Sequence, residues 1–219
     1  MSHLTCTPEA KEALCLEHTY RIASDPTSPV IFFVHGRAGT YDVMWLFRRA
    51  VPDCFHIITP QAPLRDPLRG FSWWQVHAHM KPNEEEVATS AKLLTGFFTK
   101  SIEYYNLMPR KILALGFSQG GGILSWGLQN ELLKIDGMGF LASFLYPSSP
   151  VGTRIHFGAQ RVFWAHGTQD EVVSCSRARL DVQLLQENGI PVEYREEDVG
   201  HKVGARSLNA LKDWIASFS

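Results

Sequence analysis

A serine framed by glycines lies near the middle of the chain, in the segment Gly116-Phe117-Ser118-Gln119-Gly120. A serine hydroxyl is a weak nucleophile at neutral pH and needs a base to take its proton before it can attack a carbonyl. The apolar run Lys111–Gly116 predicts a buried strand, and Gln119–Gln129 predicts a helix that begins directly after it. Such a sharp strand-to-helix turn lifts a serine hydroxyl above a sheet. The segment therefore predicts a nucleophilic Ser118, and the alternative is a small-residue loop that only packs helix against strand.

The base is predicted from chain order, because nucleophilic turns of this kind are followed first by an acid and then by a histidine. His201 leaves enough chain for an acid at a strand end before it, and it lies in a loop ahead of the last predicted helix. His166 directly follows a predicted strand and is expected to be a structural or supporting residue. Three histidines in all follow Ser118, namely His156, His166 and His201.

The acid must lie at the carboxyl end of a strand, on the same edge of the sheet as the serine. Asp170 meets this condition, since Trp164 to Asp170 runs from a strand into a turn. It would hold the imidazole of His201 in the tautomer that accepts the Ser118 proton. Glu171 is the neighbouring alternative. The remaining carboxylates after Ser118 are expected on helix surfaces, strand bodies or polar turns: Asp136, Asp181, Asp198, Glu187, Glu193, Glu196 and Glu197.

A tetrahedral intermediate on Ser118 would need hydrogen-bond donors for its oxyanion. One expected donor is the backbone N–H of Gln119, immediately after the nucleophile. The second should come from the loop after the strand Val30–Val34, which reads His35-Gly36-Arg37-Ala38-Gly39-Thr40. The backbone N–H of Arg37 is the expected donor there, and a plain strand terminus is the alternative reading of that loop.

Other side chains carry weaker signals. His77 and His79 alternate as metal ligands can, but no third ligand is near in sequence, so neither a metal nor a cofactor is expected. Cys175 lacks the turn of a nucleophile, which disfavours a thiol mechanism. Four aromatic residues are candidates to wall an acyl or aromatic pocket, with core or loop packing as the equal alternative: Trp45, Phe71, Trp73 and Trp74.

Short apolar runs alternate with longer amphipathic segments along the chain, which predicts an α/β fold with a mostly parallel sheet. The segment Gln61–Asn83 has little regular pattern, and the connection Tyr146–Gln160 is too short for an inserted cap. The expected strands are Val30–Val34, Phe55–Thr59, Lys111–Gly116, Phe140–Leu145, Val162–Ala165 and Pro191–Arg195, and the expected helices are Tyr41–Ala50, Glu84–Tyr105, Gln119–Gln129, Ser176–Asn188 and Ala205–Phe218.

Composition narrows the function classes. The chain has 219 residues, of which 45% are hydrophobic and 20% charged, as expected for one domain spanning residues 1–219. A formal net charge of −1 gives no sign of nucleic-acid binding. No apolar run is long enough to span a bilayer, so no stable membrane insertion is expected. Four scattered cysteines, and a first segment without a basic start or an apolar core, favour a cytoplasmic protein with reduced thiols.

Taken together, these motifs resemble the phospholipase/carboxylesterase family of α/β-hydrolases, which includes the acyl-protein thioesterases. The resemblance implies an α/β-hydrolase fold without a large cap, and hydrolysis of esters or thioesters of short to medium acyl chains. It also implies small-molecule substrates, acylated proteins in some members, and frequent homodimers. The family commonly has leucine where this chain has Arg37. The resemblance rests on Phe32-Phe33-Val34-His35-Gly36, Gly70-Phe71-Ser72-Trp73-Trp74, Gly116-Phe117-Ser118-Gln119-Gly120-Gly121, His166-Gly167-Thr168-Gln169-Asp170-Glu171-Val172-Val173 and Gly200-His201-Lys202-Val203.

Three hypotheses on function are open at this point. The first is a serine esterase or thioesterase that forms an acyl-enzyme on Ser118. The second is a ligand-binding protein that keeps a hydrolase fold without turnover, since a fold alone does not determine function. The third is a peptidase or a carbon–carbon hydrolase that uses the same three residues.

Overall fold

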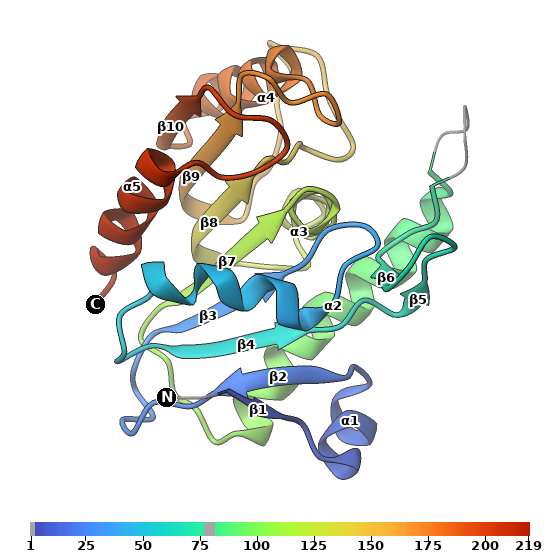
Figure 1. The fold of residues 1–219 in the computed structure, drawn as a ribbon, viewed down its shortest axis with the longest axis vertical. Helices are drawn as coiled ribbons and strands as arrows, with labels where there is room; N and C mark the ends of the chain where they lie inside the picture. Colours follow the sequence, from blue (N-terminus) through green and yellow to red (C-terminus); the bar gives the residue numbers. More distant parts are fainter. Residues whose placement is uncertain (1–2, 77–81) are drawn as a thin grey trace.

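An eight-stranded sheet runs through the middle of the protein (Figure 1). The computed structural model describes residues 3–76 and 82–219. From one edge to the other the strands follow the order β1-β2-β4-β3-β7-β8-β9-β10. The pairs from β4 to β10 are parallel, while β1 and β2 are joined antiparallel at one edge. The sheet strands are β1 (Leu4–Thr5), β2 (His18–Arg21), β3 (Val30–Val34), β4 (His56–Pro60), β7 (Ile112–Phe117), β8 (Ile135–Leu141), β9 (Ala159–Gly167) and β10 (Val192–Glu197).

Helices cover both faces of this sheet, which explains why its central strands β3 and β7 are apolar throughout. In β3 every residue is buried. Because side chains alternate along a strand, Val30, Phe32 and Val34 belong to one core, and Ile31 and Phe33 to the other. The first core is closed by α1 (Pro8–Leu14), α2 (Glu84–Tyr104), α3 (Gln119–Gln129) and α4 (Cys175–Glu187), and the second by the 3₁₀ helix η1 (Tyr41–Ala50) and α5 (Ala205–Ala216).

The sequence prediction of a mostly parallel sheet without a large cap is confirmed. The helix after Ser118 has the predicted bounds, and each other predicted helix is found within two residues at either end, although η1 is a 3₁₀ helix. Between Tyr146 and the start of β9 at Ala159 the chain forms no helix or strand. The connection where a cap would be inserted is therefore short and irregular.

Several features differ from the prediction. The short helix α1 was not expected from the sequence. The hairpin of β1 and β2 was missed, since strands of two and four residues carry too little apolar alternation to be recognised. Strand β8 begins at Ile135 and ends at Leu141, although the prediction began at Phe140. The segment Gln61–Asn83 contains a separate two-stranded hairpin of β5 (Leu64–Arg65) and β6 (Phe71–Ser72).

His77 and His79 lie outside the described residues. Within residues 3–76 and 82–219, no group of three or more His, Cys, Asp or Glu side chains is arranged to hold a metal ion. In the same part of the chain, every helix is too short or too polar to cross a membrane.

Candidate active site

Ser118 occupies a strained turn between β7 and α3. Its backbone has φ 51° and ψ −120°, a conformation that residues with a side chain rarely adopt. Hydrogen bonds hold the turn from two sides: Ser118 N–H donates to the carbonyl of Leu141 at 3.0 Å, and Ser143 Oγ donates to the Ser118 carbonyl at 2.6 Å. Strain that persists under such restraint is typical of functional sites.

The glycines around Ser118 are required by close backbone approach. A Cβ on Gly116 would clash with the backbone of Gly121, and a Cβ on Gly120 would clash with the carbonyl oxygen of Val34. The turn can therefore form only where β7, β3 and α3 meet without side chains between them. The glycine spacing read from the sequence has this contact as its physical cause.

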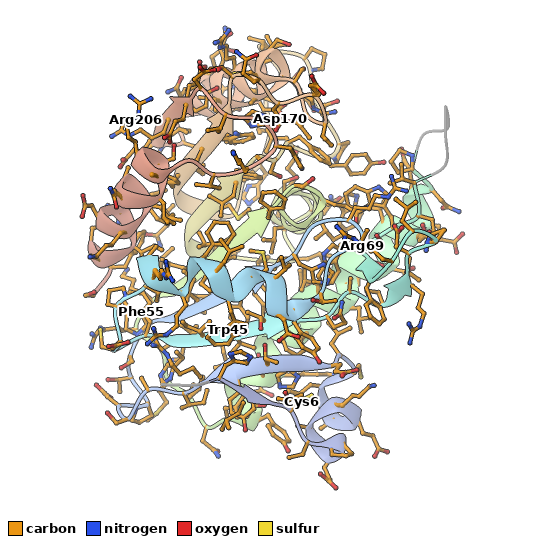
Figure 2. All side chains as sticks on the ribbon, in the orientation of Figure 1. Cys6, Trp45, Phe55, Arg69, Asp170 and Arg206 are labelled. Carbon is orange, nitrogen blue, oxygen red and sulfur yellow. The ribbon has the colours of Figure 1, made fainter. Side chains whose placement is uncertain are left out.

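His201 and Asp170 form a hydrogen-bonded pair, as the sequence predicted for a base and its acid. The Nδ1 of His201 lies 2.8 Å from Oδ2 of Asp170. His201 follows β10, and Asp170 follows β9, its parallel neighbour in the sheet. Figure 2 shows Asp170 in the loop beyond the end of β9.

The carboxylate of Asp170 is fully buried, and its second oxygen, Oδ1, accepts two backbone hydrogen bonds. The backbone N–H groups of Val172 and Val173 both donate to Oδ1 at 2.9 Å. These bonds fix the carboxylate so that Oδ2 faces His201. Glu171, the alternative acid, is exposed and makes no hydrogen bond to His201.

His166 is a second histidine that contacts Asp170. Its Nε2 lies 2.8 Å from the carbonyl of Val173 and 3.3 Å from Oδ2 of Asp170. Burial lowers the pKa of His166, which keeps the ring neutral. It therefore contacts the same carboxylate oxygen as His201 without reaching the cavity, in agreement with its expected supporting role.

Two backbone N–H groups are available beside Ser118. Those of Arg37 and Gln119 donate to no acceptor among the described residues. Gln119 directly follows Ser118 at the first position of α3, and Arg37, in the loop after β3, lines the same cavity as Ser118. Unpaired N–H groups at such a position are what an oxyanion requires.

His35 holds the loop that carries Arg37, a role that sequence reasoning missed. The ring is fully buried. The Ala62 N–H donates to Nε2 at 3.0 Å, so the ring proton lies on Nδ1, which is 2.8 Å from the carbonyl of Gly36. Burial lowers the pKa of His35 to about 4, so the ring is neutral at neutral pH. Its position directly after β3 was the only signal in the sequence.

A cavity of about 590 Å³ opens above these residues, and both Ser118 and His201 line it. No hydrogen bond joins their side chains among the residues described, as is frequent in hydrolases before substrate tightens the arrangement. The remaining walls come mainly from the loop after β3, from the β5–β6 turn and from one valine after Asp170. They are Gly36, Arg37, Ala38, Gly39, Thr40, Val43, Leu68, Arg69, Gly70, Phe117 and Val172.

The four aromatic residues expected to wall the pocket do not line this cavity. Trp45 lies on η1, where its Nε1 donates to Thr19 Oγ1 at 2.7 Å and its ring stacks on His3. Phe71 pairs through its backbone with Gly39 and lies under the guanidinium of Arg65.

Trp73 and Trp74 are almost completely buried and connect parts of the site instead. The Trp73 indole donates to the carbonyl of His35 at 2.8 Å, and its backbone N–H donates to Oε1 of Gln119 at 2.9 Å. Nε2 of Gln119 donates to the Trp74 carbonyl at 2.9 Å. The two tryptophans therefore tie the loop after β3 to the serine turn, whereas the apolar walls of the cavity include Phe117, Val43, Leu68 and Val172.

Two carboxylates expected on surfaces are largely buried, but neither lines the cavity. Asp181 accepts a hydrogen bond from the Leu145 N–H at 2.8 Å. Glu197 accepts from both Ser207 N–H and Ser207 Oγ, and so caps the start of α5. Each carboxylate therefore accepts a hydrogen bond from a backbone N–H group, that of Leu145 or that of Ser207.

A family model described as phospholipase/carboxylesterase matches residues 20–219. Among curated proteins, acyl-protein thioesterase 1 of Gibberella zeae is 26% identical over 216 residues, which covers 88% of this chain and 91% of that protein. Carboxylesterase SOBER1 of Arabidopsis thaliana is 23% identical over 110 residues. That second match spans 49% of this chain and about half of the relative, 48%.

Solved structures show the same fold at low identity. The Bacillus cereus carboxylesterase superposes with a TM-score of 0.82 at 18% identity, covering 96% of this chain and 98% of the other. A carboxylesterase from Mesorhizobium loti gives 0.80 at 16% identity, with 99% of each chain covered. Together with the family match, these likenesses confirm the α/β-hydrolase fold.

Proposed function

The chain belongs to the phospholipase/carboxylesterase family of hydrolases, and we propose that it cleaves carboxylic esters or thioesters of short to medium acyl chains through an acyl-enzyme on Ser118. The observation that carries this proposal is the hydrogen bond of 2.8 Å between His201 and the buried Asp170, with His201 and the strained Ser118 facing one cavity. A nucleophile, a base oriented by an acid, and a shared space for the reacting carbonyl are the parts that acyl transfer needs.

In the proposed mechanism Asp170 accepts a hydrogen bond from the Nδ1–H of His201, so that Nε2 is left to accept the hydroxyl proton of Ser118. Ser118 Oγ attacks the carbonyl carbon, and the backbone N–H groups of Arg37 and Gln119 stabilise the oxyanion. The imidazolium then protonates the leaving alcohol or thiol. A water activated by the same ring hydrolyses the acyl-enzyme and restores Ser118.

The cavity supports acyl chains of limited length. Apart from Phe117, its apolar walls are mainly aliphatic side chains with substantial exposure: Val43, Leu68 and Val172 are 48%, 74% and 69% exposed. Such a site is open to solvent, so a bulky acyl carrier, including an acylated protein, can approach Ser118. A homodimer and a cytoplasmic setting also belong to the proposal, on the family resemblance and the cysteine pattern alone.

The test combines turnover with covalent labelling. The wild type should hydrolyse p-nitrophenyl acetate and butyrate with an initial burst, and a fluorophosphonate probe should label Ser118. Ser118→Ala should not be labelled, and its kcat should fall by a factor of about 10⁶, as it does when the nucleophile of other serine hydrolases is removed. Unchanged labelling of Ser118→Ala, or no burst and no labelling of the wild type, would overturn the proposal and favour a binding protein.

A further inference from the structure

The titratable side chains that line the cavity include two arginines and no carboxylate. Arg37 and Arg69 lie in its wall together with His201, and no Asp or Glu is among its lining residues. Arg69 is exposed, and it forms no ion pair with any residue that the structure describes. Figure 2 shows Arg69 beside the loop that follows β3. A ligand at Ser118 therefore meets positive charge from two different loops.

Arg37 is held in place by a buried carboxylate behind it. Its Nε donates to Oδ2 of Asp66 at 3.1 Å, and the Asp66 side chain is fully buried. Asp66 is further bound by the Leu68 N–H at 2.9 Å and by Ser72 Oγ at 2.7 Å. Burial, the largest influence, would raise the pKa of Asp66, yet these hydrogen bonds lower the pKa on balance, so the carboxylate stays ionised.

This contact uses only one edge of the guanidinium. The two Nη groups of Arg37 donate to no acceptor among the described residues, and 36% of the side chain is exposed. A guanidinium fixed through Nε presents its Nη groups in a rigid geometry suited to a carboxylate or a phosphate. Asp66 is itself an anion and would repel such a ligand, but its side chain is fully buried and does not line the cavity.

A purely structural role explains only part of this arrangement. The β5–β6 hairpin is already joined to the loop after β3 without Arg37, since Phe71 N–H donates to the Gly39 carbonyl at 2.9 Å and Ala38 N–H donates to Ser72 Oγ at 3.1 Å. Structural need also gives no reason for Arg69, which lines the same cavity from the β5–β6 turn and forms no ion pair with an acid in the described part of the chain.

We propose that Arg37 and Arg69 form a binding site for an anionic group, a carboxylate or a phosphate, carried by the ester or thioester substrate. The proposal rests on the proposed hydrolase function and names its substrate class. The anion lies on either the acyl part or the leaving group, and the two placements share the same recognition chemistry. Arg37 contributes the oriented contact, and Arg69 adds charge at the opening.

Two matched substrate pairs separate these placements. In the acyl pair, p-nitrophenyl hexanoate is compared with the mono-p-nitrophenyl ester of adipic acid, which has the same leaving group and a terminal carboxylate. In the leaving-group pair, S-butyrylpantetheine is compared with S-butyryl-4′-phosphopantetheine, which adds one phosphate to the same thioester. The measured quantity is the selectivity ratio, kcat/KM of the anionic member over that of the neutral member.

We expect the wild type to favour the anionic member of at least one pair, and the preferred pair identifies where the anion lies. Arg37→Gln should lower that ratio about tenfold, as loss of a charge-assisted hydrogen bond does. Arg69→Gln should lower it about threefold, since the contact is exposed. Both losses should appear in KM, and the wild-type ratio should fall as ionic strength rises. Arg154→Gln, an exposed arginine outside the cavity, is the matched control and should leave the ratio unchanged.

Three outcomes would overturn the inference. Equal rates for both members of both pairs would show that the wild type does not read the charge, while the hydrolase function would stand. A ratio unaffected by Arg69→Gln, together with a parallel fall for charged and neutral substrates in Arg37→Gln, would make Arg37 a structural residue. If Arg37→Gln does not fold, the Arg69→Gln ratio alone decides. Absence of hydrolysis for all four substrates, with no fluorophosphonate labelling, would instead refute the proposed function.

Discussion

Replacing Asp170 by asparagine tests the proposed acid with the smallest change in shape. Oδ1 of the new side chain can still accept the N–H groups of Val172 and Val173, which now bond Asp170 at 2.9 Å. The amide nitrogen then takes the place of Oδ2, 2.8 Å from Nδ1 of His201. Because an amide N–H can only donate there, the imidazole proton moves to Nε2, and the ring can no longer accept the proton of Ser118.

The expected loss follows from that tautomer change. The equivalent substitution in a serine protease lowers kcat by about 10⁴, which corresponds to about 5.5 kcal/mol of transition-state stabilisation. The protein itself should remain folded, with a loss of about 1–3 kcal/mol in the free energy of unfolding for the charged hydrogen bond to His201. In a chain of this length, that loss lowers Tm by about 2–4 °C for each kcal/mol.

The assay is kcat for p-nitrophenyl acetate, measured on folded protein whose Tm has been recorded. Glu171→Gln is the matched control, because Glu171 is exposed and adjacent in sequence. It should keep kcat within about a factor of two, as surface substitutions usually do. If Asp170→Asn retained more than about a tenth of kcat, or if Glu171→Gln caused the larger loss, the tautomer argument would be refuted.

Three further predictions concern the scaffold. Gly120→Ala places a methyl group against the carbonyl of Val34 and should prevent stable folding; a stably folded variant would contradict this close approach. Gly96→Ala in α2 is the control, because no atom lies within 4 Å of the added methyl group. It should raise the free energy of unfolding, measured by urea titration, by about 0.5–1 kcal/mol. Burial raises the pKa of Asp181 to about 6 from its ordinary 3.8, so stability is lost as pH rises from about 4 through 6. Asp181→Asn should therefore raise the free energy of unfolding by up to about 3 kcal/mol at pH 8 and by only about 1.5 kcal/mol at pH 5. An equal effect at both pH values would argue against an ionised buried carboxyl. Trp73→Ala should lower Tm strongly and reduce kcat/KM for acetate and octanoate esters in equal proportion, and a selective loss for octanoate would restore this residue to the substrate pocket.

The sequence predicted the site best where the required residues lie together in one short segment. The turn at Ser118 was recognised because its glycines, its preceding strand and its following helix lie within one continuous segment. His201 and Asp170 were found by chain order and by their positions after strands. Parallel strands bring such positions to one edge of the sheet, so distance along the chain did not matter.

The pocket walls were less predictable, because they depend on contacts between distant loops. Trp73 and Trp74 have the composition of a substrate pocket, yet their indole and backbone groups bond to the loop after β3 and to Gln119. Leu68 and Val172 line the cavity and are largely exposed, which nothing in their local sequence indicates. An aromatic residue fits a core and a pocket equally well, and only the surrounding fold decides between them.

The backbone position of Arg37 was predictable from a local motif, but the contacts of its side chain were not. Its backbone position follows from a local rule, since the residue after His-Gly at the end of β3 is where a second oxyanion donor is expected. Its side chain, by contrast, is defined by Asp66, which lies in a hairpin that the sequence did not predict. The backbone would thus serve a reaction common to the family, while the side chain would select the substrates that undergo it. On this proposal, substitutions in the loop after β3 and in the β5–β6 hairpin would change substrate specificity in this protein, while Ser118, Asp170 and His201, which follow β7, β9 and β10, would keep their positions.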